Sequence, residues 1–181
     1  MFSRAVIVAA IVAVAALGVV KHGTFSGHAW SIEVPSDYVN EPSATPDDRT
    51  KIIAFTPDSR ADGTRPLVQL SFMDLSDSSK SLPPLEAFAA AMIRGVERRR
   101  EEWAVEKTKV LVGGRTMLRY AWSGVAIPAP DGAQQRARVR GVMLVGVDGA
   151  VGFMLSTQDA EAHAAESLPL CERSLRTFRM K

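Results

Sequence analysis

The stretch RVRGVMLVGVDGAVGFMLST, residues 138–157, decides the fold of this chain. Two apolar runs flank Asp148-Gly149, a dipeptide typical of a two-residue hairpin turn. With Val147 paired to Ala150, one side of the hairpin carries Val142, Leu144, Val151, Phe153 and Leu155, and the other carries Met143, Val145, Val147 and Met154. Both faces are apolar, so each face of the resulting sheet needs a covering layer.

Alternating apolar residues between turn signals predict the other elements. Strands are expected at residues 28–35, 51–55, 67–75, 106–112, 115–127, 138–147 and 150–157, with loops at 36–49, 57–66 and 128–133. A helix is expected at 82–103, capped by Ser81, and a second at 161–177, capped by Asp159 and divided or kinked at Pro169. The two helices can supply the covering layers. The sequence therefore predicts an α+β fold, an antiparallel sheet of about six to seven strands between helices (an α/β/α sandwich).

The chain begins with an apolar segment that indicates export. Residues 5–20 carry no polar side chain and lie between Arg4 and Lys21. This layout is typical of a signal peptide. Sixteen residues span roughly 24 Å as a helix, which is short of the ~30 Å hydrocarbon core. We expect residues 1–22 to be a signal peptide or an N-terminal membrane anchor, 23–27 a tether, and 28–181 one domain outside the cytoplasm, periplasmic or held at the inner membrane.

Charge and composition exclude several classes of function. The chain has 22 Lys and Arg and 20 Asp and Glu. Without Arg4 and Lys21, which flank the apolar segment, the rest of the chain has no net charge. A neutral domain argues against a nucleic-acid binder. Cys171 is the single cysteine, so no intrachain disulfide forms. The histidines His22, His28 and His163 have no zinc-ligand spacing. No metal site and no cofactor are expected, and the aspartates of the 57–66 and 74–81 loops fit turn chemistry better than calcium binding.

No catalytic motif is recognisable, and the chain is not expected to be an enzyme. Cys171 shares a helix face with Leu168, Leu175 and Phe178, which predicts a buried structural thiol. The run Arg98-Arg99-Arg100 lies among Glu97, Glu101 and Glu102. Within one helix these acids would neutralise it as a solvated face.

The middle hairpin carries the candidate binding residues. If Ile127 lies opposite Gln134, then Ser123 faces Arg138 and Ala121 faces Arg140. Arg119, Arg136, Arg138 and Arg140 then share one face near an end of the sheet. Neighbouring like charges destabilise a sheet unless something offsets them. Two interpretations remain open: arginines paired with helix glutamates, or a patch for an acidic protein partner or an anionic lipid surface.

Residues 28–179 resemble the PsbP-like superfamily. The resemblance rests on Val34-Pro35 followed by Tyr38, on Ser81-Leu82, on the Gly113-Gly114-Arg115 turn before Tyr120, and on Leu175-Arg176-Thr177-Phe178. The superfamily includes the extrinsic PsbP subunit of photosystem II, a Ran-binding nuclear import factor and bacterial envelope proteins such as DcrB. The resemblance implies an α/β/α sandwich and a binding or assembly role without a shared active site.

These observations favour a non-enzymatic exported accessory or assembly domain of the bacterial cell envelope that binds a protein partner. The alternative is a binder of a small ligand or lipid between sheet and helix. A cavity lined by Trp30, Trp122, Met143 or Met154 would favour it. A hydrolase with an unrecognised site would need clustered titratable side chains in one cleft.

Overall fold

The computed structural model describes residues 18–41, 48–76, 82–127 and 136–181. The helices are α1 (Leu85–Glu97) and α2 (Glu161–Arg176). The strands are β1 (Gly18–Phe25), β2 (His28–Pro35), β3 (Val39–Glu41), β4 (Thr50–Thr56), β5 (Leu67–Asp74), β6 (Arg100–Val112), β7 (Arg115–Ala126), β8 (Arg138–Asp148), β9 (Val151–Ala160) and β10 (Arg179–Met180).

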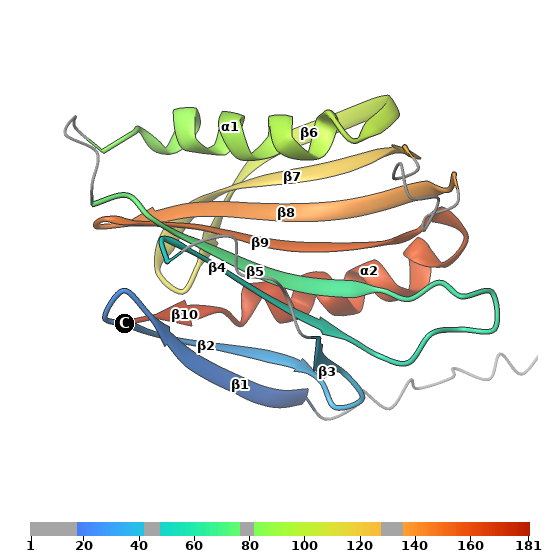
Figure 1. The fold of residues 1–181 in the computed structure, drawn as a ribbon, viewed down its shortest axis with the longest axis horizontal. Coiled ribbons are helices and arrows are strands. Elements are labelled where there is room, and N and C mark those ends of the chain that lie inside the picture. Colours follow the sequence, from blue (N-terminus) through green and yellow to red (C-terminus); the bar gives the residue numbers. More distant parts are fainter. Residues whose placement is uncertain (1–17, 42–47, 77–81, 128–135) are drawn as a thin grey trace, which may run out of the picture.

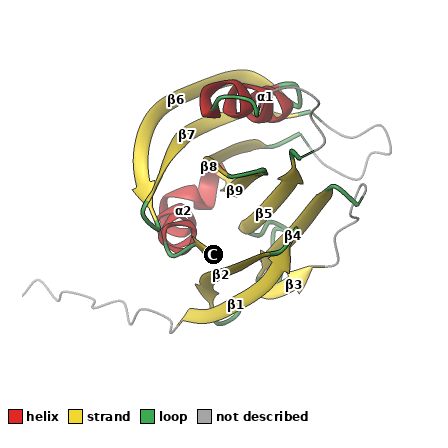
Figure 2. Cartoon of the chain, turned by 90° about the vertical axis from the view of Figure 1, so that its left-hand side faces the viewer, coloured by secondary structure: helices red, strands yellow, loops and turns green. Residues whose placement is uncertain are grey.

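Seven strands form the main antiparallel sheet, in the order β3-β4-β5-β9-β8-β7-β6. Helix α1 covers one face of this sheet, and α2 lies on the other (Figure 1). A second sheet, β1-β2-β10, lies beside α2 and completes that layer. Figure 2 shows the long strands β6 and β7 curving around the two helices. The α+β sandwich is confirmed, with one difference: strand 28–35 belongs to the second sheet rather than to the main one.

The two faces of the β8–β9 hairpin are as the sequence predicts, although the turn is displaced. Asp148 pairs with Val151 and Val147 with Gly152, so the pairing lies two residues from the expected register. A shift of two residues leaves every side chain on its face, because side chains alternate with period two. Val142, Leu144, Phe153 and Leu155 therefore lie in the core on the α2 side, and Met143 and Val145 in the core under α1.

The expected tether is wrong, because residues 18–25 form β1. This strand pairs with β2 from Gly18, opposite Pro35, to Phe25, opposite His28. Ser26 and Gly27 make the turn with φ of 46° and 81°. Part of the expected 36–49 loop is also a strand, since Val39–Glu41 pairs with β4 as β3. Residues 1–17, most of the predicted export segment, lie outside the described residues, as do Ser81 and the 128–133 loop.

The first helix is shorter than expected, from 85 to 97 rather than 82 to 103. The chain turns after Arg98 and enters β6, where Arg100 pairs with Ala126. A bulge between Glu101 and Ala104, with φ of 50° at Glu102, bends the strand onto the curved sheet. Backbone pairing along β7 outweighs the helical pattern of this stretch, which local sequence alone does not reveal.

Helix α2 departs from its sequence pattern at two positions. Ala160, rather than Asp159, is the N-cap residue, and the helix continues through Pro169 to Arg176. Asp159 is instead the penultimate residue of β9, where its carboxylate is buried. Within the described ranges, no helix is both long and apolar enough to span a membrane.

Candidate functional site

The middle hairpin places the candidate arginines on one face, on the α2 side of the sheet. Ser123 lies opposite Arg140, and Arg119 lies opposite Leu144. The register again differs by two residues from the expected one, so the faces are unchanged. Arg138 is the first residue of β8, and Arg136 lies just before it.

Each of these arginines has a carboxylate partner. Arg119 donates two hydrogen bonds to Glu172 of α2, from Nε at 2.9 Å and from Nη2 at 2.8 Å. The hydrogen bond to Glu172 raises the pKa of Arg119, against the effect of burial. Because Arg119 is only 20% exposed, this forked pair fastens α2 to the sheet.

The side chains of the other three arginines are exposed to solvent. Arg136 pairs with Glu101, Arg138 pairs with Glu102, and Arg140 lies 3.5 Å from a carboxylate oxygen of Glu161. Arg136 is 63% exposed and Arg140 55%. Exposed pairs of this kind contribute about 0–1 kcal/mol to folding, so they hold the arginines only weakly.

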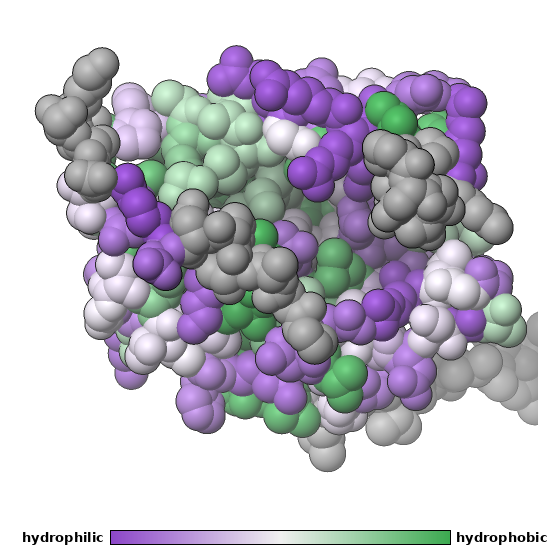
Figure 3. Space-filling model, viewed as in Figure 1, coloured by the Kyte–Doolittle hydropathy of each residue, from purple (hydrophilic) through white to green (hydrophobic). Residues whose placement is uncertain are grey.

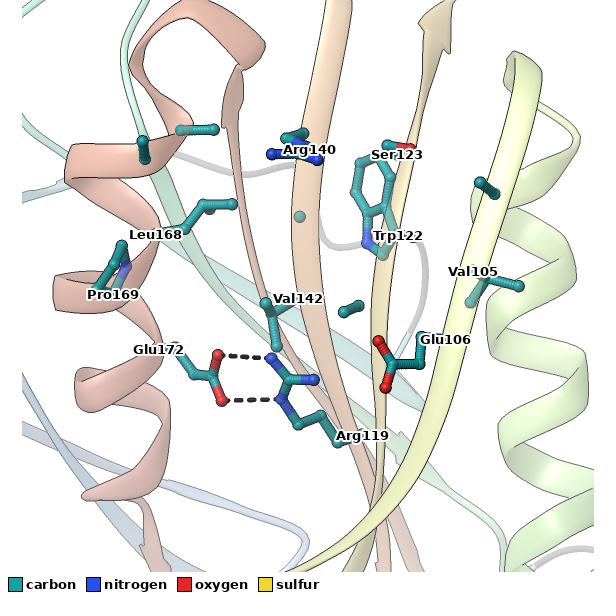
Figure 4. A pocket seen from close by; sticks show the side chains of 15 residues that line it. Val105, Glu106, Arg119, Trp122, Ser123, Arg140, Val142, Leu168, Pro169 and Glu172 are labelled. Carbon is teal, nitrogen blue, oxygen red and sulfur yellow. Dashed lines mark hydrogen bonds and ion pairs between the residues drawn. The ribbon is translucent and has the colours of Figure 1, made fainter.

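A groove of about 610 Å³ runs between α2 and the strands β6 to β8, and we call it the α2 groove (Figure 4). Small side chains form its floor, among them Ala121, Ser123 and Val142. Leu168 and Pro169 of α2 form one wall, and Glu106 of β6 points in from the other. Glu172 accepts hydrogen bonds from Arg119 and Arg176, which lower its pKa. Glu172 is therefore an anion at neutral pH and is not suited to proton exchange.

The expected neutralisation of Arg98–Arg100 by neighbouring glutamates is wrong for Arg100. The chain leaves the helix before residue 100, so Glu101 and Glu102 project toward Arg136 and Arg138 instead. Within the described part of the chain, Arg100 has no carboxylate partner. Its guanidinium lies 5.2 Å from the ring centre of Trp122 and donates to the Gln158 side chain and the Arg99 carbonyl.

Arg100 borders a second and larger cleft, of about 850 Å³, which we call the α1 cleft. It lies between the C-terminal half of α1 and the part of the sheet that the helix leaves uncovered. Figure 3 shows the apolar surface of α1 on this face and the recess below it. Its apolar lining includes Met92 and Val96 from α1 and Leu67, Trp122, Met143 and Met154 from the sheet. Its polar lining includes Gln69, Ser156, Gln158, Arg99 and Arg100.

A buried polar network joins α2 to the 60–64 loop. Asp159 accepts hydrogen bonds from both terminal nitrogens of Arg60, at 2.9 and 2.7 Å, and from the Ser167 hydroxyl at 2.6 Å. Burial opposes ionisation of Asp159, but these hydrogen bonds outweigh it and lower its pKa. The network therefore joins the β4–β5 connection, through Arg60, to the end of β9 and to Ser167 of α2.

Cys171 is fully buried on the core face of α2, in the environment expected of a structural thiol. Its sulfur lies 3.1 Å from the Tyr38 hydroxyl. Burial is the main cause that raises the pKa of Cys171, and it does the same to Tyr38. A thiol with a raised pKa is a poor nucleophile at neutral pH.

Sequence reasoning missed the Arg60–Asp159 pair and the part that Arg99 and Arg100 play in the α1 cleft, although it named Trp122, Met143 and Met154 as possible cavity residues. The cleft exists because α1 ends at Glu97, six residues before the expected end. The pair was missed because Asp159 and Arg60 are 99 residues apart in the sequence, and because an aspartate just before a helix is typical of an N-cap residue. No group of three or more His, Cys, Asp or Glu side chains that could hold a metal occurs among the described residues.

Neither the models of known protein families nor the sequences of curated proteins match this chain. Its fold is nevertheless shared by solved structures. Cyanobacterial PsbP from Synechocystis has a TM-score of 0.62 at 7% identity, over 92% of this chain and 94% of its own. LpqN of Mycobacterium tuberculosis has 0.57 at 11% identity, over 90% and 91%. Protein PA94 of Pseudomonas aeruginosa has 0.52 at 11% identity, over 87% and 94%. The resemblance to the PsbP-like superfamily is confirmed as a likeness of fold.

Proposed function

We propose that this protein is a non-enzymatic accessory or assembly domain, exported to the bacterial cell envelope, that binds a protein partner through Arg136, Arg138 and Arg140. One observation carries the proposal: three exposed arginines project from one end of the sheet, and within the described ranges the acids that pair with them are exposed glutamates. A partner's carboxylates can replace those glutamates at little cost in folding free energy. Guanidinium groups favour such forked recognition.

Arg119 has a different role in this proposal. Its forked pair with Glu172 is largely buried and joins β7 to α2. We infer that Arg119 positions the α2 groove beside the exposed arginines and does not itself contact the partner.

The likeness to LpqN supports the cell-envelope location, and the place where β1 begins bears on the choice between a signal peptide and an anchor. LpqN, which shares the fold, is described as involved in cell envelope biogenesis. The apolar run at the start of the chain also overlaps β1, which begins at Gly18 and is paired with β2. If β1 stays paired, thirteen apolar residues, 5–17, remain before it. As a helix they would span roughly 20 Å against the ~30 Å hydrocarbon core, which favours a cleaved signal peptide over an anchor.

The test is site-specific photocrosslinking in living cells. A photoreactive amino acid at Ser123, in the α2 groove beside Arg140, should crosslink to one protein of the envelope. The double variant Arg138→Glu, Arg140→Glu should abolish that crosslink and leave the melting temperature within a few degrees, since the pairs it removes are exposed. Arg94→Glu with Arg98→Glu, in the last turn and at the C-cap of α1 on the other face of the sheet, is the control with the same change in charge.

The result also separates a protein partner from an anionic lipid. Loss of the crosslink in the arginine-face variant alone supports the proposal. A stable variant that crosslinks as well as wild type contradicts it. Binding of the purified protein to phosphatidylglycerol vesicles that is lost in the variant, without any protein crosslink, assigns the arginines to lipid instead.

A second candidate function is the binding of a small ligand. The α1 cleft is lined by Trp122, Met143 and Met154, three of the four residues at which a cavity was expected to favour this function. Its volume of about 850 Å³ is in the range of ordinary ligand sites, roughly 300–1,000 Å³.

A further inference from the structure

We propose that the α1 cleft binds a small amphipathic carboxylate, with the charged group at Arg100 and the apolar chain under α1. The inference rests on the second candidate function, ligand binding, and adds the chemistry of the ligand. Three properties of the cleft support it: an arginine with no acidic partner and a buried donor with no acceptor among the described residues, and an apolar pocket beside both.

The first property is the charge of Arg100. Two of the five N–H groups of its guanidinium are engaged, with the Arg99 carbonyl at 2.9 Å and with Gln158 at 3.1 Å. Burial, and next the charge of Arg99, lower the pKa of Arg100. Both effects disfavour the cation, so an anion placed beside this guanidinium would be bound favourably.

Among the residues that the structure describes, the other charged groups of the lining do not supply that anion. Asp62 lies at the rim of the cleft, but its carboxylate is already bonded to the backbone and hydroxyl of Thr64 and to His163 Nε2 at 2.8 Å. Arg99 is the remaining charged residue of the lining, and it adds a second positive charge. The cleft is therefore electropositive at the end where Arg100 lies.

The second property is the unsatisfied polar atoms beside Arg100. Trp122 is 6% exposed, and its indole Nε1 has no hydrogen-bond partner among the described residues. Arg100 Nε is also buried, and no described residue accepts a hydrogen bond from it. A buried donor without an acceptor costs about 1–3 kcal/mol. A carboxylate brings acceptor oxygens, so a small shift of the Arg100 side chain toward it can satisfy these donors.

The third property is the apolar pocket next to this polar end. Met92 and Val96 of α1 lie over Met143 and Met154 of the sheet, and all four line the cleft. Methionine side chains are flexible and adapt to chains of different length. Gln69, Ser156 and Gln158 lie on the uncovered strands between, so the site runs from apolar to cationic. An alkyl carboxylate matches this arrangement, because its chain is apolar and its head group is an anion.

The experiment titrates the exported chain, purified from cells, with decanoate and with decanol by calorimetry. We expect saturable decanoate binding with a Kd below about 1 mM and decanol binding about tenfold weaker, because decanol lacks the charge that pairs with Arg100. The three tryptophans provide a site-specific readout by ¹H–¹⁵N NMR. The indole signals of Trp122 and of Trp103, which stacks on it, should shift, and that of Trp30, in the other core, should not.

Two variants test the placement of head and chain. Arg100→Gln should weaken decanoate binding about tenfold and leave decanol binding unchanged, and Arg98→Gln is the control with the same loss of charge outside the cleft. Gly95→Leu should block both ligands. The cleft borders Gly95, a Cβ there meets no heavy atom within 4 Å, and the substitution favours the helix, so the variant should fold.

Equal binding of decanoate and decanol, or of decanoate to Arg100→Gln and wild type, would overturn the carboxylate inference while leaving ligand binding intact. No binding of either ligand, or a shift confined to Trp30, would overturn both. Unchanged binding in a folded Gly95→Leu variant would show that the chain lies elsewhere.

Discussion

Arg60→Met should destabilise the protein strongly, because it leaves the Asp159 carboxylate buried without its cation. The Asp159 side chain is 0% exposed, and Arg60 supplies two of its hydrogen bonds. Hydrogen bonds to charged groups contribute about 1.5–3 kcal/mol each. Breaking a buried ion pair costs about 3–5 kcal/mol, and the 29% exposure of Arg60 places the loss near the lower end of that range. For a domain of this size the Tm should fall by roughly 10 °C.

The deficit should also depend on pH, with a sign that follows from the pKa of Asp159. In wild type this pKa is lowered, so the pair stabilises the fold above the ordinary carboxyl pKa of about 4 and loses its effect as the pH falls through the lowered pKa. Burial is already the largest single influence on the pKa of Asp159. Without Arg60, only the hydrogen bonds from Ser167 and Ala160 oppose it, so the pKa rises. The difference in unfolding free energy between wild type and variant should therefore be largest near pH 7 and shrink toward pH 4.

Chemical denaturation of both proteins across this pH range measures the effect. Arg65→Met is the matched control. Arg65 lies in the same loop region, but its pair with Glu41 is 40% and 32% exposed, so its loss should cost less than about 1 kcal/mol. Adding Asp159→Asn to Arg60→Met should recover part of the stability, because a neutral amide is easier to bury. A deficit no larger than that of Arg65→Met, or one independent of pH, would refute the reasoning.

Three further predictions concern the core, a glycine and the location. The buried Cys171 thiol should react slowly with a labelling reagent until the protein is denatured, and fast labelling of the native protein would contradict this. Cys171→Ala should lower the free energy of unfolding by about 1–2 kcal/mol, measured by chemical denaturation, and should retain binding. Gly141→Ala should lower stability by about 1–3 kcal/mol, because its Cβ would lie 2.6 Å from the Thr157 carbonyl oxygen and against the Trp122 ring, whereas Gly95→Ala should raise the Tm. An alkaline phosphatase fused to the C-terminus should be active if the body is exported, and an inactive fusion would reject that location.

The sequence by itself determined the pattern of faces in the main sheet. Residues of β8 and β9 alternate so regularly that a hairpin displaced by two residues still sends Val142 and Phe153 to one core and Met143 to the other. The same alternation along β7 and β8 placed Arg119, Arg138 and Arg140 on one face of the sheet. Side-chain direction has a period of two, so a prediction of faces survives any even error in register.

Only the tertiary structure decided where α1 ends and which charges pair. Residues 98–103 carry helix-favouring arginines and glutamates, yet α1 ends at Glu97 and β6, paired with β7, begins at Arg100. As a result, Glu101 pairs with Arg136 and Glu102 with Arg138, and Arg100 has no acidic partner in the described part of the chain. The α1 cleft opens at the same place. Likewise, residues 18–25 form a strand only because β2 lies alongside. These outcomes depend on partners distant in sequence, whose contribution to the free energy exceeds local propensities of a few tenths of a kcal/mol per residue.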